Sequence, residues 1–180
     1  MLEKLEGALP GLTRWRVPGG RGVDWGALEA GLGTALPSDF RSLAEAYPVL
    51  SIGDFLMVSL PRPGGEASWA AESRNDEILQ DWYEMEDMED YVPYPRPGGL
   101  ISWASSNCGD VFCWRTSPAD PDAWPVVVRT DNGDWNEFPE GVGAVEFLAG
   151  VYGHTLDVPG MPENFPGDRP EVLGLGEPDD

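Results

Sequence analysis

Two β-hairpin signals in direct succession constrain the fold of this chain more than any other feature of its sequence. In the first, residues 101–104 alternate as a strand does, and residues 111–114 resume as a strand. Between them, Asn107-Cys108-Gly109-Asp110 has the composition of a turn. This pattern is most simply a β-hairpin.

The second hairpin follows directly and leads into a helix. Residues 125–129 are apolar and β-branched, residues 135–138 return, and Asp131-Asn132-Gly133-Asp134 lies between them. The Asn-Gly pair tolerates the positive φ angles of a tight hairpin. After Pro139, a helix that ends near Gly153 is predicted by apolar residues at helical spacing, namely Val142, Val145, Leu148 and Tyr152. The two hairpins therefore predict an antiparallel sheet with a helical cover.

The N-terminal third predicts two further helices and a strand. Asp24 is a suitable N-cap for a short amphipathic helix that ends around residues 31–33. A second helix begins at Pro37, which suits a first turn, and stops at Pro48. Its apolar stripe consists of Phe40, Leu43, Ala44 and Tyr47. Residues 52–60 predict the first strand.

These elements predict an α+β fold, with N-terminal helices and a C-terminal helix packed on a twisted antiparallel sheet. The length of 180 residues and the hydrophobic content of 41% favour one soluble domain. We expect an N-terminal extension over residues 1–22, a domain over 23–153, and an acidic tail rich in Pro and Gly over 154–180. The tail is expected to be extended or disordered toward its end, although three apolar side chains can pin its first half: Leu156, Val158 and Phe165.

Neither a secretory signal nor a membrane span is predicted. Residues 1–12 contain no uninterrupted apolar region, and no window approaches the roughly 18 apolar residues that a membrane-spanning helix requires. The expected location is therefore the cytoplasm.

The charge of the chain limits its partners. With 32 acidic and 11 basic residues, the formal net charge is -21. Such a chain repels nucleic acid, which requires a basic surface. An acidic field favours encounters with cationic partners, although surplus acid can also serve only to keep a protein soluble.

Acidic residues concentrate between residues 74 and 96, a window without a base. Asn75 is a potential N-cap, and Ile78, Trp82 and Met85 recur at helical intervals, so that much of the window is predicted to be helical with Trp82 in the core. The acids of the window are Asp76, Glu77, Asp81, Glu84, Glu86, Asp87, Glu89 and Asp90. Like charges three or four residues apart on a helix destabilise it, so that either a partner uses the charge or the helix frays near its end.

Tyrosines beside these acids suit a protein interface, where aromatic anchors and charges occur together. The predicted partner-binding residues are Asp81, Tyr83, Glu84, Asp87, Asp90, Tyr91 and Tyr94. The expected partner is a protein, in particular a basic one, and neither nucleic acid nor a membrane.

Catalytic and metal sites find little support. His154 is the sole histidine, which excludes a pair of histidine ligands. The run from Asp131 to Asp134 lacks the ligand spacing of a calcium loop, and Asp120 and Asp122 are better explained as loop formers than as a carboxylate pair. The two cysteines, Cys108 and Cys113, are interpreted as reduced thiols. No catalytic residue, metal or cofactor is predicted.

Four loose motifs occur in a characteristic order. They are Trp25, Leu28-Glu29, Leu32-Gly33 and Leu36-Pro37-Ser38-Asp39-Phe40-Arg41; Cys108-Gly109-Asp110-Val111-Phe112-Cys113-Trp114; Asp120-Pro121-Asp122-Ala123-Trp124-Pro125-Val126-Val127; and Glu146-Phe147-Leu148. Over roughly residues 23–152 this set resembles the SUKH superfamily, also called the Smi/Knr family. One departure is Tyr47-Pro48, where members usually carry Gly after the helix.

The resemblance implies an α+β fold and, as for many bacterial members, an immunity role. Such proteins bind and neutralise a toxin, often a nuclease, of a polymorphic or contact-dependent system. Fungal members are similar in fold but act as scaffolds in cell-wall and signalling regulation.

The sequence thus favours a non-catalytic protein-binding domain, most simply an immunity protein that masks a basic toxin surface. One alternative is a scaffold that binds a host protein. Another is a protein that binds or hydrolyses a small molecule in a pocket on the sheet lined by Trp103, Trp114 and Trp135.

Overall fold

One antiparallel sheet organises the computed structural model, which describes residues 1–139 and 141–176. Across this sheet the strands follow the order β6, β5, β4, β3, β2, β1, β7, and each neighbouring pair is antiparallel. In chain order the strands are β1 Val49–Ile52, β2 Leu56–Val58, β3 Leu100–Ser106, β4 Val111–Arg115, β5 Val126–Arg129, β6 Trp135–Glu137 and β7 Val172–Leu175.

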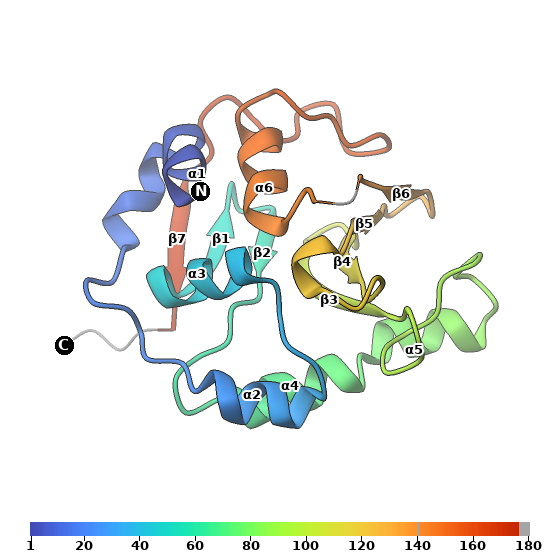
Figure 1. The fold of residues 1–180 in the computed structure, drawn as a ribbon. Coiled ribbons are helices and arrows are strands. Elements are labelled where there is room, and N and C mark those ends of the chain that lie inside the picture. The colour runs from blue at the N-terminus through green and yellow to red at the C-terminus, as the bar shows by residue number, and fades with distance from the viewer. Residues whose placement is uncertain (140, 177–180) are drawn as a thin grey trace.

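Helices cover mainly one face of the sheet (Figure 1). They are α1 Leu2–Ala8, α2 Trp25–Leu32, α3 Ser38–Ala46, α4 Glu66–Arg74, α5 Glu77–Glu84 and α6 Ala144–Tyr152, with 3-10 turns at η1 Pro10–Trp15 and η2 Pro121–Ala123. The helices α1, α3 and α6 lie over the same face, and α2 packs on α4 beyond the end of the strands. Near α4, α5 contributes to a separate, smaller apolar cluster on the opposite face. The predicted α+β class is confirmed.

Both predicted hairpins are confirmed. The strands β3 and β4 pair across the turn at residues 107–110, and β5 and β6 pair across residues 130–134. In the second turn only Gly133 has a positive φ, of 91°, so that the glycine of the Asn-Gly pair alone supplies the left-handed conformation. The helices predicted after Asp24, after Pro37 and before Gly153 are present as α2, α3 and α6.

The prediction of one continuous strand over residues 52–60 is wrong. The chain turns at Gly53 and Asp54, whose φ angles of 66° and 54° are incompatible with a strand, and it forms the hairpin β1–β2. Helix α4 is also absent from the predicted elements. Its buried side chains, which include Trp69 and Ala70, cover the sheet end beside α2.

The predicted acidic helix is shorter than expected. Its N-cap is Asp76, whose side chain accepts from the N–H groups of Ile78 and Leu79, whereas Asn75 ends the preceding helix α4. The helix stops at Glu84, because Glu86 adopts a φ of 58° that no right-handed helix accommodates. Asp87 and Asp90 therefore lie in a loop.

Aromatic side chains form the centre of the main core. The indoles of Trp103 on β3 and Trp114 on β4 are fully buried and stack with ring centroids 5.7 Å apart. Phe40 of α3 meets Trp114 edge to face at 4.7 Å, and Phe147 of α6 meets Trp103 at 6.1 Å. These contacts attach α3 and α6 to the two central strands.

Segments outside residues 23–153 belong to this core. Leu5, Leu9 and Leu12 of the N-terminal segment are buried in it, as are Val158 and Val172 of the C-terminal segment. Strand β7, which the sequence pattern does not predict, extends the sheet by pairing with β1. The last four residues of the predicted tail, 177–180, lie outside the described residues.

A carboxylate joins two of the helices that cover the sheet, α3 and α6. Asp39, in the first turn of α3, is buried and accepts a hydrogen bond of 2.9 Å from the Val145 N–H in the first turn of α6. Burial raises the pKa of Asp39 above its usual range. A Cβ at Gly143 would lie 2.3 Å from the Asp39 carboxylate, which leaves space for glycine alone. Asp39 therefore caps a helix other than its own.

We expect Asp39→Ala to lower the free energy of unfolding by about 1–3 kcal/mol, because it leaves the buried Val145 N–H without an acceptor. The exposed Asp157 provides the control, and Asp157→Ala should change stability by no more than about 0.5 kcal/mol. Urea denaturation of the three proteins measures both values. Equal urea midpoints for Asp39→Ala and Asp157→Ala would show that the hydrogen bond from the Val145 N–H to Asp39 does not stabilise the fold.

Candidate functional site

The candidate site is the surface formed by α5 and the loop that follows it. Seven of its carboxylates are exposed, and in the part of the chain that the structure describes no salt bridge joins six of these to a base. We call these six residues the acidic surface: Glu77, Asp81, Glu84, Glu86, Glu89 and Asp90. In Figure 1 this region lies at the opposite corner of the molecule from α1.

Asp87 does not belong to this unpaired set. Its carboxylate accepts from the guanidinium of Arg129 on β5, which also lies over the ring of Trp82 at 3.9 Å. The window without a base in the sequence thus receives one from the sheet. Asp87 serves to hold the loop on β5.

Tyr91 attaches the same loop to β6. Its ring packs on Trp135 with centroids 4.8 Å apart, and its hydroxyl donates to Glu137 at 3.2 Å. Burial and the neighbouring Glu137 carboxylate raise the pKa of Tyr91 to about 12, so that the hydroxyl remains a donor at neutral pH. Arg115 binds the same carboxylate at 2.7 Å and 2.9 Å.

The other two tyrosines differ in their roles. The hydroxyl of Tyr94 donates to the Leu32 carbonyl at 2.8 Å, which ties the loop to the end of α2. Tyr83 is 40% exposed, with the Arg96 guanidinium 4.2 Å from its ring centroid. Of the predicted partner-binding residues, four are exposed and have no ion pair or side-chain hydrogen bond within the described chain, namely Asp81, Tyr83, Glu84 and Asp90. The structure assigns internal contacts to the other three, which are Asp87, Tyr91 and Tyr94.

Two acids of the loop are held in an unfavourable conformation. Glu86 and Glu89 have φ angles of 58° and 48°, in the left-handed region that only glycine, asparagine and aspartate adopt readily. The side chain of Met88, between them, is 2% exposed and packs in the smaller cluster with Leu79 and Val127. Met88 thus fixes a strained loop that presents acids to solvent, and residues that keep backbone strain concentrate at functional sites.

The apolar stripe expected on the acidic helix does not face the core. Leu79 is the buried residue of α5, whereas Ile78 is 52% and Met85 is 65% exposed. Trp82 is half-buried beneath Arg129 rather than in the main core. Trp82 was expected in the core because it continues the face of Ile78, but that face is not buried in the main core: Ile78 is exposed, and Trp82 packs only against the smaller cluster.

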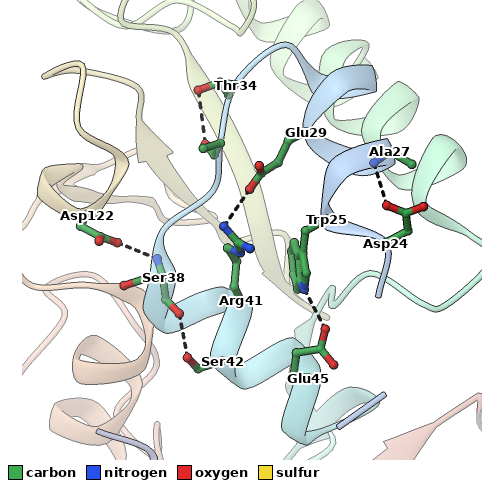
Figure 2. Close-up of polar contacts among 11 residues, drawn as sticks. Asp24, Trp25, Ala27, Glu29, Thr34, Ser38, Arg41, Ser42, Glu45 and Asp122 are labelled. Atoms are coloured by element: carbon green, nitrogen blue, oxygen red, sulfur yellow. Dashed lines mark hydrogen bonds and ion pairs between the residues drawn. The ribbon is translucent and has the colours of Figure 1, made fainter. Parts of the chain in front are cut away.

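Carboxylates elsewhere in the chain satisfy backbone and side-chain donors (Figure 2). Asp24 accepts from the Ala27 N–H at the start of α2, and Asp122 accepts from the Ser38 N–H at the start of α3. Glu45 accepts the Trp25 indole N–H at 2.7 Å. The Arg41 guanidinium lies 3.2 Å from the Glu29 carboxylate, and Figure 2 shows it directed toward that group. These acids are structural, in contrast to those of the acidic surface.

The other residues considered for chemistry are the acidic, cysteine and histidine side chains outside this surface. Among the described residues no group of three or more His, Cys, Asp or Glu side chains is arranged to hold a metal ion. Burial raises the pKa of the Cys113 thiol, which opposes a nucleophilic role, and His154 is exposed beyond α6.

The predicted pocket lined by three tryptophans is wrong. Trp103 and Trp114 are fully buried in the main core, while Trp135 packs with the smaller cluster on the other face of the sheet. Because side chains on opposite faces of a sheet cannot line one cavity, this site does not exist.

Comparison with known proteins gives no match to a family model, to a curated protein or to a solved structure. Among the residues that the structure describes, no helix has the length and apolar character needed to cross a membrane.

The two cysteines should differ sharply in reactivity. Cys108 is exposed in the β3–β4 turn, whereas Cys113 is fully buried. We expect a thiol reagent to label Cys108 in the native protein and Cys113 only after denaturation. Mass spectrometry of peptides labelled with and without urea checks this, and native labelling of Cys113 would contradict the packing of the smaller cluster.

The strain at Glu86 can be separated from its charge. Glu86→Gln removes the charge and keeps the strain, while Glu86→Asn removes both, because asparagine tolerates the left-handed region. We expect the Asn variant to exceed the Gln variant in unfolding free energy by about 0.5–1 kcal/mol. Chemical denaturation of the pair measures the difference, and identical stabilities would show that the loop is relaxed.

Proposed function

We propose that this chain is a non-catalytic protein-binding domain whose acidic surface binds a basic partner. The observation that carries the proposal is that six exposed acids without an ion pair lie together on one surface. Many other acids cap helices or hold loops, whereas the six of the acidic surface contact no base in the described chain. Unpaired like charges on one surface steer a cationic protein toward it.

The rigidity of this surface supports the proposal. The loop after α5 is held by the Asp87–Arg129 ion pair, by the packing of Tyr91 on Trp135 and by the buried Met88. A surface that is ordered before binding loses less conformational entropy when the partner docks. The acids are thus arranged in advance for an interaction.

We further propose that the protein acts as an immunity protein against a basic, nuclease-type toxin in the cytoplasm. This step rests on the resemblance of the sequence motifs to the SUKH superfamily and on the charge. The carboxylates of the acidic surface would occupy the phosphate-binding positions of the toxin and block its substrate groove. Inhibition would be stoichiometric, with one protein masking one toxin domain.

The proposal predicts that a toxin domain is encoded next to this chain, and the test uses that domain. Asp81→Asn, Glu84→Gln and Asp90→Asn are combined in one variant, and Asp87 is left intact because it pairs with Arg129. At low salt we expect this variant to associate about tenfold more slowly than wild type, with a smaller difference at moderate salt. Stopped-flow fluorescence measures the association rate, and nuclease assays at increasing molar ratio measure inhibition.

The control removes the same charge elsewhere. Glu3→Gln, Asp157→Asn and Glu163→Gln neutralise three exposed acids that lie outside the acidic surface. Their combined variant should associate nearly as fast as wild type. The proposal fails if both variants slow association equally, because net charge would then act without a specific surface, or if neither variant has an effect.

A further inference from the structure

An open groove crosses the part of the sheet that α5 leaves uncovered. It consists of three adjoining hollows of about 390, 240 and 210 Å³. Ser59, Trp69 and Glu72 line both of the larger hollows, Met57 lines the first and third, and Ser105 lines the second and third. Because the hollows share these walls, they form one continuous depression, which we call the β2–β3 groove.

The sheet supplies the floor of this groove. Met57 of β2 lies opposite Ser51 of β1 and Ser105 of β3, so that these side chains form one row on the same face. Met57 is 48% exposed, and Ser59 and Ser105 are exposed. Most of the floor is thus small and hydroxylic, with one long apolar side chain, and no helix of the described chain covers it.

Two exposed apolar side chains line this groove. The structure exposes five large hydrophobic residues in the described chain, which are Met1, Met57, Ile78, Tyr83 and Met85. Met57 and Ile78 line the groove, and Tyr83 and Met85 lie on or directly after the same helix as Ile78. Apolar side chains beside unpaired charges are typical of a binding surface, where the apolar contacts supply affinity and the charges supply the encounter rate.

We infer that the β2–β3 groove receives an apolar side chain from a cationic segment of the partner protein, while flanking Lys or Arg side chains meet the acids around it. The inference rests on the proposed function and deepens it, because it separates the anchor of the interface from its charged rim. The acids concerned are Glu72 and Asp54 in the walls of the groove and Glu77 and Asp81 on α5.

The charge of the groove decides between occupants. A second copy of this chain would bring a formal net charge of -21 against the same acids, which opposes self-association through this face. The single base among the residues that line the three hollows, Arg62, borders only the 390 Å³ hollow. A cationic segment is therefore attracted to the parts of the groove away from Arg62, where Asp54 and the acids of α5 lie.

Two synthetic peptides of equal charge test the inference. One is an eight-residue alternation of Lys and Leu, the other an alternation of Lys and Ser, both with blocked ends. We expect the wild-type protein to bind the Leu peptide at least tenfold more tightly by fluorescence titration. The indole N–H resonance of Trp69 should shift with the Leu peptide and not with the Ser peptide, since Trp69 lines the groove and donates to the Ser59 carbonyl at 3.1 Å.

Substitutions at Met57 and Ile78 test whether the groove causes the preference for the Leu peptide. The double variant Met57→Ser and Ile78→Ser should bind both peptides alike, with an unchanged affinity for the Ser peptide. Met85→Ser is the matched control, because Met85 is 65% exposed but does not line any of the three hollows. It should keep the preference for the Leu peptide.

Three results would overturn the inference: equal binding of both peptides by the wild type, a preference that survives the double variant, or an equal loss in the Met85 variant. A wild-type dimer in sedimentation experiments that the double variant abolishes would also overturn it, by assigning the groove to a second copy. These results leave the proposed function intact as long as neutralising Asp81, Glu84 and Asp90 still weakens the binding of both peptides. If that neutralisation has no effect on either peptide, the proposed function itself fails.

Discussion

The shortage of bases is the constraint on which this structure depends. With 11 bases for 32 acids, most carboxylates cannot be ion-paired, and those that enter the interior must accept hydrogen bonds from uncharged donors. Asp39 accepts from the first turn of α6, and the buried Asp110 accepts from the Asp131 N–H and from a serine hydroxyl. Burial acts to raise the pKa of Glu45, but the N–H donors of the segment before α2 and the Trp25 indole outweigh it and lower that pKa.

The same shortage explains where the remaining acids lie. Arg129 is the base that reaches the loop after α5 through an ion pair, and it contacts only Asp87 there. The other acids of the loop and helix stay exposed, and Asp81 and Glu84 face the C-terminal end of α5, where the helix dipole disfavours negative charge. These positions oppose stability locally, which is the physical reason to connect them with binding rather than with folding.

Local patterns predicted the sheet because its signals are local. Turn residues and β-branched segments indicated both hairpins, and Asp24 and Pro37 marked the starts of two helices. The turn at Gly53 was missed because apolar residues on both sides read as one strand. Strand β7 and the contacts of Asp39 and Arg129 join residues more than 40 positions apart, and no local pattern records them. At the candidate site, composition indicated the acids but not which of them form ion pairs. The helical spacing of Ile78, Trp82 and Met85 predicted a helix there, but it does not reveal that Ile78 and Met85 are exposed.

The central claim is that the acidic surface is kept at a cost to stability. The most direct test is the unfolding free energy of wild type and of a variant with Asp81, Glu84, Glu86, Glu89 and Asp90 changed to Asn or Gln, measured over a range of salt concentrations. The account predicts that the variant is the more stable protein at low salt and that the two values converge at high salt, because screening removes the same repulsion. A variant that is less stable than wild type at low salt would show that these acids support the fold, and the claim would be wrong.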